Sequence, residues 1–137
     1  MRVGPPRGAT ATLEVTVTPD MAAIVAGEQI HPVYGTAALV QHMEQVSRAL
    51  LVPHLESGEE GVGAGVDLIH RAPVPIGETV VLTATVATVA PTKLVCEVLT
   101  RHGATIVARG SVEQRVVPLA AFRDEVEARR TRPQAAV

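Results

Sequence analysis

Aromatic residues are almost absent from this chain of 137 residues, which has one Tyr, one Phe and no Trp. The interior must therefore be built from Val, Ala, Leu, Ile and Met, which suits a tightly curved sheet wrapped on one helix. The same scarcity argues against base-stacking platforms, aromatic cages and most flavin or haem pockets.

Cysteine is equally scarce. The single residue, Cys96, excludes an internal disulfide framework and a Cys-rich metal site. It shares a strand face with Leu94 and Val98, so we predict a buried small hydrophobe rather than a nucleophile. Four histidines have no ligand-like spacing to carboxylates or to Cys96, and we expect no metal site: His31, His42, His54 and His102.

The chain also lacks a strong net charge and a long apolar segment. Twelve basic and fourteen acidic residues give a formal charge of −2, without the basic stripe that nucleic-acid binding needs. No apolar run reaches the roughly 20 residues of a membrane helix, and the N-terminus has no signal-peptide core. With 47% apolar residues and a mean hydropathy of +0.26, we expect one folded cytoplasmic domain spanning residues 1–137, with loose ends at 1–8 and 131–137.

One long helix is predicted over residues 36–52. Its apolar side chains recur at helical spacing and form one stripe, Leu39, Met43, Val46 and Leu50. Gln41, Gln45 and Arg48 lie on the opposite side, and Pro53 ends the helix.

Alternating apolar residues predict five strands, at 11–18, 62–70, 80–86, 94–101 and 105–117. We expect a short helical turn at 21–25, a loop at 27–35 and a charged terminal helix at 119–130. The order predicts an α+β fold in which a five-stranded antiparallel sheet wraps around one long central helix. A single helix covers only one face of such a sheet, so the other face or an edge needs a partner. This order and size resemble the hot-dog fold, which pairs as a dimer.

Glu44 is the first candidate for chemistry. On a helical wheel it lies between Val40 and Leu51, at the edge of the apolar arc. It could form an i,i+4 surface pair with Arg48, worth about 0.3–0.5 kcal/mol. It could instead be a partly buried catalytic carboxylate that acts as a base or nucleophile.

His70 and Thr36 also admit two interpretations each. His70 ends an apolar alternation just before Arg71, so it is either a rim residue or a general acid/base held by a strand. Thr36 is either the N-cap of the helix or a residue beside N–H groups that hold a thioester oxygen. Thr36 and Glu44 are eight residues apart, about 12 Å along a straight helix, so they would flank a substrate rather than bond to each other.

Several segments closely resemble the fluoroacetyl-CoA thioesterase-like family of hot-dog proteins: Tyr34-Gly35-Thr36, His42-Met43-Glu44, residues 53–61 and residues 63–77. The resemblance runs from about residue 13 to residue 129. It implies that Thr36, Glu44 and His70 are the catalytic threonine, glutamate and histidine. It also implies that the backbone N–H of Gly63 lies near the thioester carbonyl.

The resemblance implies a homodimeric acyl-CoA thioesterase that needs no cofactor beyond the coenzyme A thioester as substrate. Three further residues are candidates for substrate binding: Ile30, Tyr34 and Arg71. The family carries aromatic side chains in the loop before the catalytic threonine, whereas this loop has Gly27, Ile30 and Tyr34. We therefore expect hydrolysis of several short or medium acyl-CoAs without a strong fluoroacetyl preference.

Two alternatives stay open. One is a non-catalytic acyl-CoA-binding hot-dog protein, which would gain nothing from a half-buried carboxylate at Glu44. The other is a hot-dog acyl-CoA hydratase or dehydratase, but the helix lacks the Asp followed six residues later by His that is typical of those enzymes.

Overall fold

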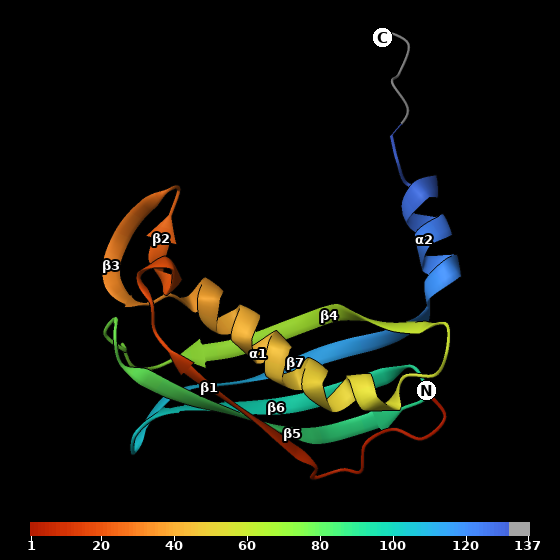
Figure 1. Ribbon diagram of the computed structural model, residues 1–137, viewed down its shortest axis with the longest axis horizontal. Coiled ribbons are helices and arrows are strands. Elements are labelled where there is room, and N and C mark those ends of the chain that lie inside the picture. Colours follow the sequence, from red (N-terminus) through yellow and green to blue (C-terminus); the bar gives the residue numbers. More distant parts are fainter. Residues whose placement is uncertain (132–137) are drawn as a thin grey trace, which may run out of the picture.

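A five-stranded antiparallel sheet curves around one long helix, α1, in the computed structural model, which describes residues 1–131 (Figure 1). The strand order is β1-β5-β6-β7-β4. The sheet strands and helices are β1 (Thr10–Thr16), α1 (Thr36–Leu51), β4 (Glu59–His70), β5 (Thr79–Ala90), β6 (Lys93–His102), β7 (Thr105–Pro118) and α2 (Leu119–Ala128). The predicted fold is confirmed, with boundaries shifted by a few residues.

The core lies between α1 and the concave face of the sheet. Alternate residues of the central strands point inward, and this is the alternation seen in the sequence. They meet the predicted stripe of α1, of which Leu39, Met43 and Val46 are almost completely buried. Cys96 belongs to this layer with 0% exposure, and burial raises the pKa of its thiol to about 11. The prediction of a buried cysteine is confirmed.

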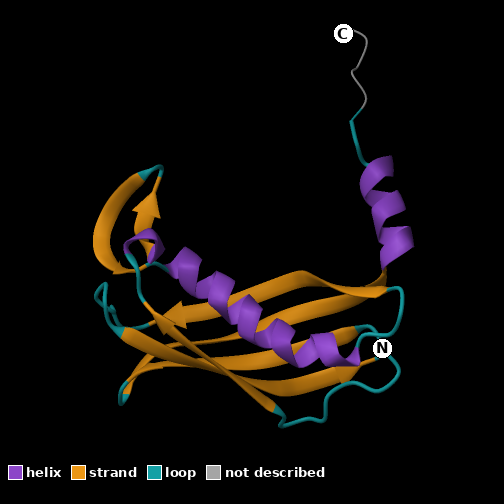
Figure 2. Ribbon diagram, viewed as in Figure 1, coloured by secondary structure: helices purple, strands orange, loops and turns teal. Residues whose placement is uncertain are grey.

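The segment before α1 differs from the prediction. Instead of a helical turn and a loop, it forms a second small sheet from β2 (Ala22–Val25) and β3 (Glu28–Tyr34), which rises at one end of α1 (Figure 2). Only a short 3₁₀ turn, Pro19–Met21, precedes it. Ala26 and Gly27 connect the strands with φ values of 51° and 78°, as a two-residue hairpin turn requires.

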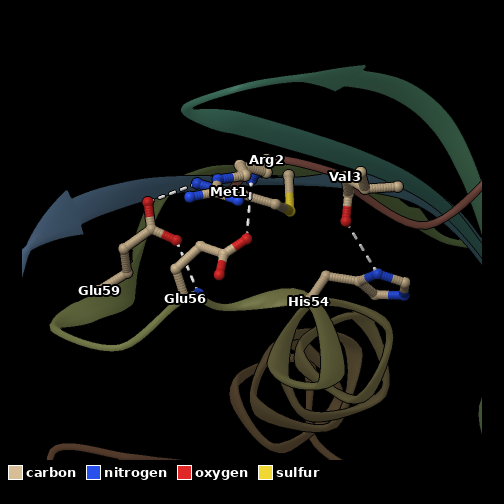
Figure 3. Close-up of polar contacts among 6 residues, drawn as sticks. All are labelled: Met1, Arg2, Val3, His54, Glu56 and Glu59. Carbon is tan, nitrogen blue, oxygen red and sulfur yellow. Dashed lines mark hydrogen bonds and ion pairs between the residues drawn. The ribbon is translucent and has the colours of Figure 1, made fainter.

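The first residues of the chain contact the end of α1 and the start of β4. Met1 is 6% exposed, and its amino group pairs with Glu59 (Figure 3). His54, in the 3₁₀ turn Val52–His54, contacts the carbonyl oxygen of Val3 at 3.1 Å. The amino group of Met1 and the backbone N–H of Glu56 hold the pKa of Glu59 below its usual range. These contacts tie the start of the segment at 1–8 to the end of α1 and the start of β4.

The helix α2 follows β7 and stands away from the sheet, with no buried residue (Figure 1). Among residues 1–131, no helix is long and apolar enough to cross a membrane. The predicted loose tail falls largely on residues 132–137, outside the described part of the chain.

Candidate active site

Thr36 and His70 meet where α1 begins and β4 ends. The backbone N–H groups of Tyr34 and Gly35 donate to the carbonyls of Val74 and Met21, at 2.8 Å each, which anchors the entry to α1. Gly35 is the N-cap, and no side chain caps the helix, so the N-cap interpretation of Thr36 is wrong. Thr36 is instead the first helical residue, and its hydroxyl lies 2.9 Å from Nδ1 of His70.

This contact uses one nitrogen of the imidazole and leaves the other without a hydrogen bond. His70 Nε2 is buried and has no hydrogen-bond partner among the described residues. If the Thr36 hydroxyl donates to Nδ1, Nε2 carries the proton and can give it away. If Nδ1–H donates to Thr36, Nε2 is a base. Either arrangement suits a general acid/base, and the pocket beside it has a volume of about 280 Å³.

Glu44 lines a different pocket, of about 310 Å³, together with Gly61, Gly63 and Gln114. It is more exposed than the helical wheel suggested. The predicted pair with Arg48 does not form, because Arg48 binds Glu60 of β4 at 2.7 Å. A Cβ atom built on Gly63 would come within 2.9 Å of Glu44 Oε2. The carboxylate thus lies directly against the Gly63 backbone.

The structure therefore brings the catalytic candidates together as two pairs, Thr36 with His70 and Glu44 with Gly63. Glu44 is about 12 Å from Thr36 along the helix. Gly63 and His70 are seven residues apart on β4, about 23 Å in an extended strand. Within one chain, Glu44 does not reach the His70 imidazole.

Two of the three candidate substrate-binding residues, Arg71 and Tyr34, line the Thr36–His70 pocket, and Ile30 does not. Tyr34 is 0% exposed, and its hydroxyl is 2.5 Å from Nδ1 of His42, so it forms an inner wall rather than a free polar contact. Ile30 is 49% exposed on β3 and lines neither pocket. His31 and Val33 of the same strand line the Thr36–His70 pocket.

Gln114 is the site residue that the sequence analysis missed. It lies on the inward face of β7, where Val112 and Val116 are apolar, and it is 5% exposed. That polar interruption of an apolar alternation was the available signal. No group of three or more His, Cys, Asp or Glu residues in the described range is placed to hold a metal ion.

Residues 17–120 match the family described as fluoroacetyl-CoA-specific thioesterase. The chain belongs to this family. It is 31% identical over 94 residues to the fluoroacetyl-CoA thioesterase of Streptantibioticus cattleyicolor, a match covering 69% of this chain and 68% of that one.

Solved structures agree with this assignment. A thioesterase superfamily member from Thermus thermophilus is 31% identical with a TM-score of 0.87, and the match covers 93% of this chain and 94% of that one. A mutant of the fluoroacetyl-CoA-specific thioesterase FlK, solved with fluoroacetate and CoA, is 28% identical with a TM-score of 0.77, covering 85% and 98%. The present chain, as a member of this family, is thus a thioester hydrolase with the hot-dog fold.

Proposed function

We propose that this protein hydrolyses a short or medium acyl-CoA to the free acid and CoA, with Glu44, His70 and Thr36 as its catalytic residues. The observation that carries the proposal is the Thr36–His70 contact, which orients the imidazole and leaves Nε2 free. The related FlK mutant bound to fluoroacetate and CoA supports the substrate class.

In the proposed reaction Glu44 either attacks the thioester carbonyl carbon or takes a proton from a water that attacks it. In the water route a C–O bond forms and the carbonyl oxygen becomes an oxyanion, held by backbone N–H groups near Gly63. The oxyanion then collapses, the C–S bond breaks, and His70 Nε2–H protonates the departing thiolate. In the covalent route water then hydrolyses the acyl-Glu44 anhydride. These steps use only protein groups and water, so the proposal needs no cofactor.

The separation of Glu44 from His70 leads us to propose a homodimer with shared sites. Within residues 1–131, β4 is an edge strand that pairs with β7 alone, and it exposes Val66 and Ile69 at 38% and 67%. A long apolar edge of this kind needs covering. If two copies of β4 pair antiparallel near their middles, the Gly63 half of one lies opposite the His70 half of the other. Each Glu44 would then face the Thr36–His70 pair of the partner subunit.

Thiol release from a series of acyl-CoAs, from acetyl to octanoyl, tests the activity. Glu44→Gln keeps the side-chain shape but removes the base or nucleophile, so kcat should fall by roughly 100-fold or more. Glu14→Gln makes the same change on an exposed residue of β1 and should leave kcat unchanged. A folded Glu44→Gln variant with wild-type kcat would show that the mechanism is wrong.

Mixing two inactive variants tests the shared site. Glu44→Gln and His70→Ala should each be inactive alone. After unfolding and refolding together, about half of the dimers are mixed and each has one intact site of two, so about one quarter of wild-type activity should return. If both catalytic groups act from the same chain, no activity returns.

A further inference from the structure

Gln114 is a buried polar residue whose side-chain nitrogen has no hydrogen-bond partner among the described residues. It is 95% removed from solvent, and its Nε2 atom bonds to nothing in the described residues. An unpaired buried polar group destabilises a fold, whereas an apolar side chain of the same shape does not. The inward-facing neighbours of Gln114 on β7, Val112 and Val116, are apolar, so the packing of this strand gives no reason for a carboxamide at this position.

The position of Gln114 places it beside the Glu44 carboxylate. It pairs in register with Gly63 of β4, which has no side chain. The space where a Cβ would stand opens toward Glu44 Oε2, at 2.9 Å. Because of that gap, Gln114 and Glu44 line one pocket although they come from β7 and α1.

The backbone around Gly63 is irregular at the same point. The register of β4 against β7 shifts between Gly63 and Gly65, so Ala64 is an extra residue in the edge strand. Such a bulge leaves a residue out of the hydrogen-bond ladder and re-aims its neighbours. The pocket thus has bulged backbone and the Gln114 side chain on one wall and the Glu44 carboxylate on the other.

We propose that Gln114 donates a hydrogen bond to the thioester carbonyl oxygen, together with the backbone N–H groups near Gly63. A half-turn of the carboxamide exchanges its N and O atoms and presents an N–H to the pocket. A fixed donor at this place strengthens as negative charge develops on the oxygen, and Gln114 itself is held out of the solvent at 5% exposure. This inference rests on the proposed thioesterase function and adds a residue to it.

Gln114→Met is the decisive variant, because it keeps the length of the side chain and removes its donor. We expect kcat to fall by about 100- to 1,000-fold, the usual loss for one oxyanion donor, with KM changed by less than about threefold. The melting temperature should stay equal or rise, because an unpaired buried amide is removed. Gln29→Met, an exposed change on β3, is the matched control and should behave as wild type.

Binding of S-ethyl-CoA separates a contact with the carbonyl from general damage to the pocket. This thioether has no carbonyl oxygen, so wild type and Gln114→Met should bind it equally well. Gln114→Leu is a second variant in case Met packs poorly.

Two results would overturn the inference: kcat within about threefold of wild type, or a kcat loss accompanied by lower melting temperature and weaker S-ethyl-CoA binding in both variants. Either result, with active wild type and inactive Glu44→Gln, leaves the proposed function standing. A wild type that hydrolyses no acyl-CoA refutes the function itself.

Discussion

Buried Tyr34 and half-buried His42 show how burial shifts the protonation of two neighbouring side chains in this fold. Their rings stack with centroids 5.8 Å apart, and the hydroxyl of Tyr34 meets His42 Nδ1. Burial raises the pKa of Tyr34 above its usual range and lowers that of His42 below 6.5. Both shifts favour the neutral form of the side chain, so the Tyr34 hydroxyl can donate to an unprotonated ring nitrogen.

The lowered pKa of His42 predicts a pH-dependent stability. Below pH 6.5 the unfolded chain takes up a proton that folded His42 resists, so the free energy of unfolding should fall as the pH drops. The double variant Tyr34→Phe with His42→Leu should lose part of this slope, measured by urea unfolding between pH 7.5 and pH 5. His31→Leu, at an exposed position, should keep it. An unchanged slope in the double variant would contradict this origin.

For single residues, the sequence identified the candidate site residues but did not predict the contacts between them. Thr36 and His70 stand at the predicted helix start and strand end, but their contact spans 34 residues and depends on tertiary packing. The wheel placed Glu44 at the edge of the apolar arc. It is nevertheless exposed, because the strand beside it carries Gly61 and Gly63, which have no side chains to cover it.

At the scale of elements, the junction of β4 with β7 has two glycines with different tasks. A Cβ on Gly110 would come within 2.0 Å of the Asp67 carbonyl oxygen, a backbone atom that cannot move alone. A Cβ on Gly63 would meet only the end of the flexible Glu44 side chain.

Alanine at these two glycines should therefore have opposite effects. Gly110→Ala should push β4 from β7 and lower the free energy of unfolding by about 1–3 kcal/mol or more. Gly63→Ala should change stability by less than about 0.5 kcal/mol but displace the Glu44 carboxylate, reducing kcat about 10- to 100-fold. Urea unfolding and thiol release on both variants decide it. A destabilised but fully active Gly63→Ala would refute the assignment of Glu44.

The hairpin of β2 and β3 was predicted as a turn and a loop for identifiable reasons. Its turn is Ala26-Gly27 instead of the Asn-Gly or Asp-Gly that signals a hairpin, and Pro32 lies inside β3. Proline is tolerated there because the two-stranded sheet consists of edge strands.

This hairpin gives the Thr36–His70 pocket a wall of small or aliphatic side chains, Ala23 and Val33, beside His31. A methylene in such a pocket is worth about 1–3 kcal/mol, so discrimination between small acyl groups should be shallow. We predict comparable kcat/KM for several short or medium acyl-CoAs and a fluoroacetyl-to-acetyl preference below about 1,000-fold. Side-by-side kcat/KM values test this. A larger preference would mean that other residues supply the selectivity.

For the whole molecule, local patterns predicted the elements, while strand order needed the structure. The alternation along β5 and β6 and the stripe of α1 are local, so each could be read from neighbouring residues. No local pattern tells that β1 pairs with β5, or that β4 crosses to the far edge beside β7. That placement leaves β4 open to a second copy.

The last prediction concerns assembly through β4. Wild-type protein should sediment as a dimer at micromolar concentration, because the β4 edge and its apolar residues need a partner. Val66, near the middle of β4, should lie close to the partner subunit's Val66. Val66→Lys would bring two like charges together there and should yield inactive monomers, since each site needs both chains. Val81→Lys is the matched control, because Val81 is 36% exposed against 38% for Val66 but lies on interior strand β5. It should remain an active dimer. A stable wild-type monomer that hydrolyses acyl-CoA would refute both the dimer and the shared site.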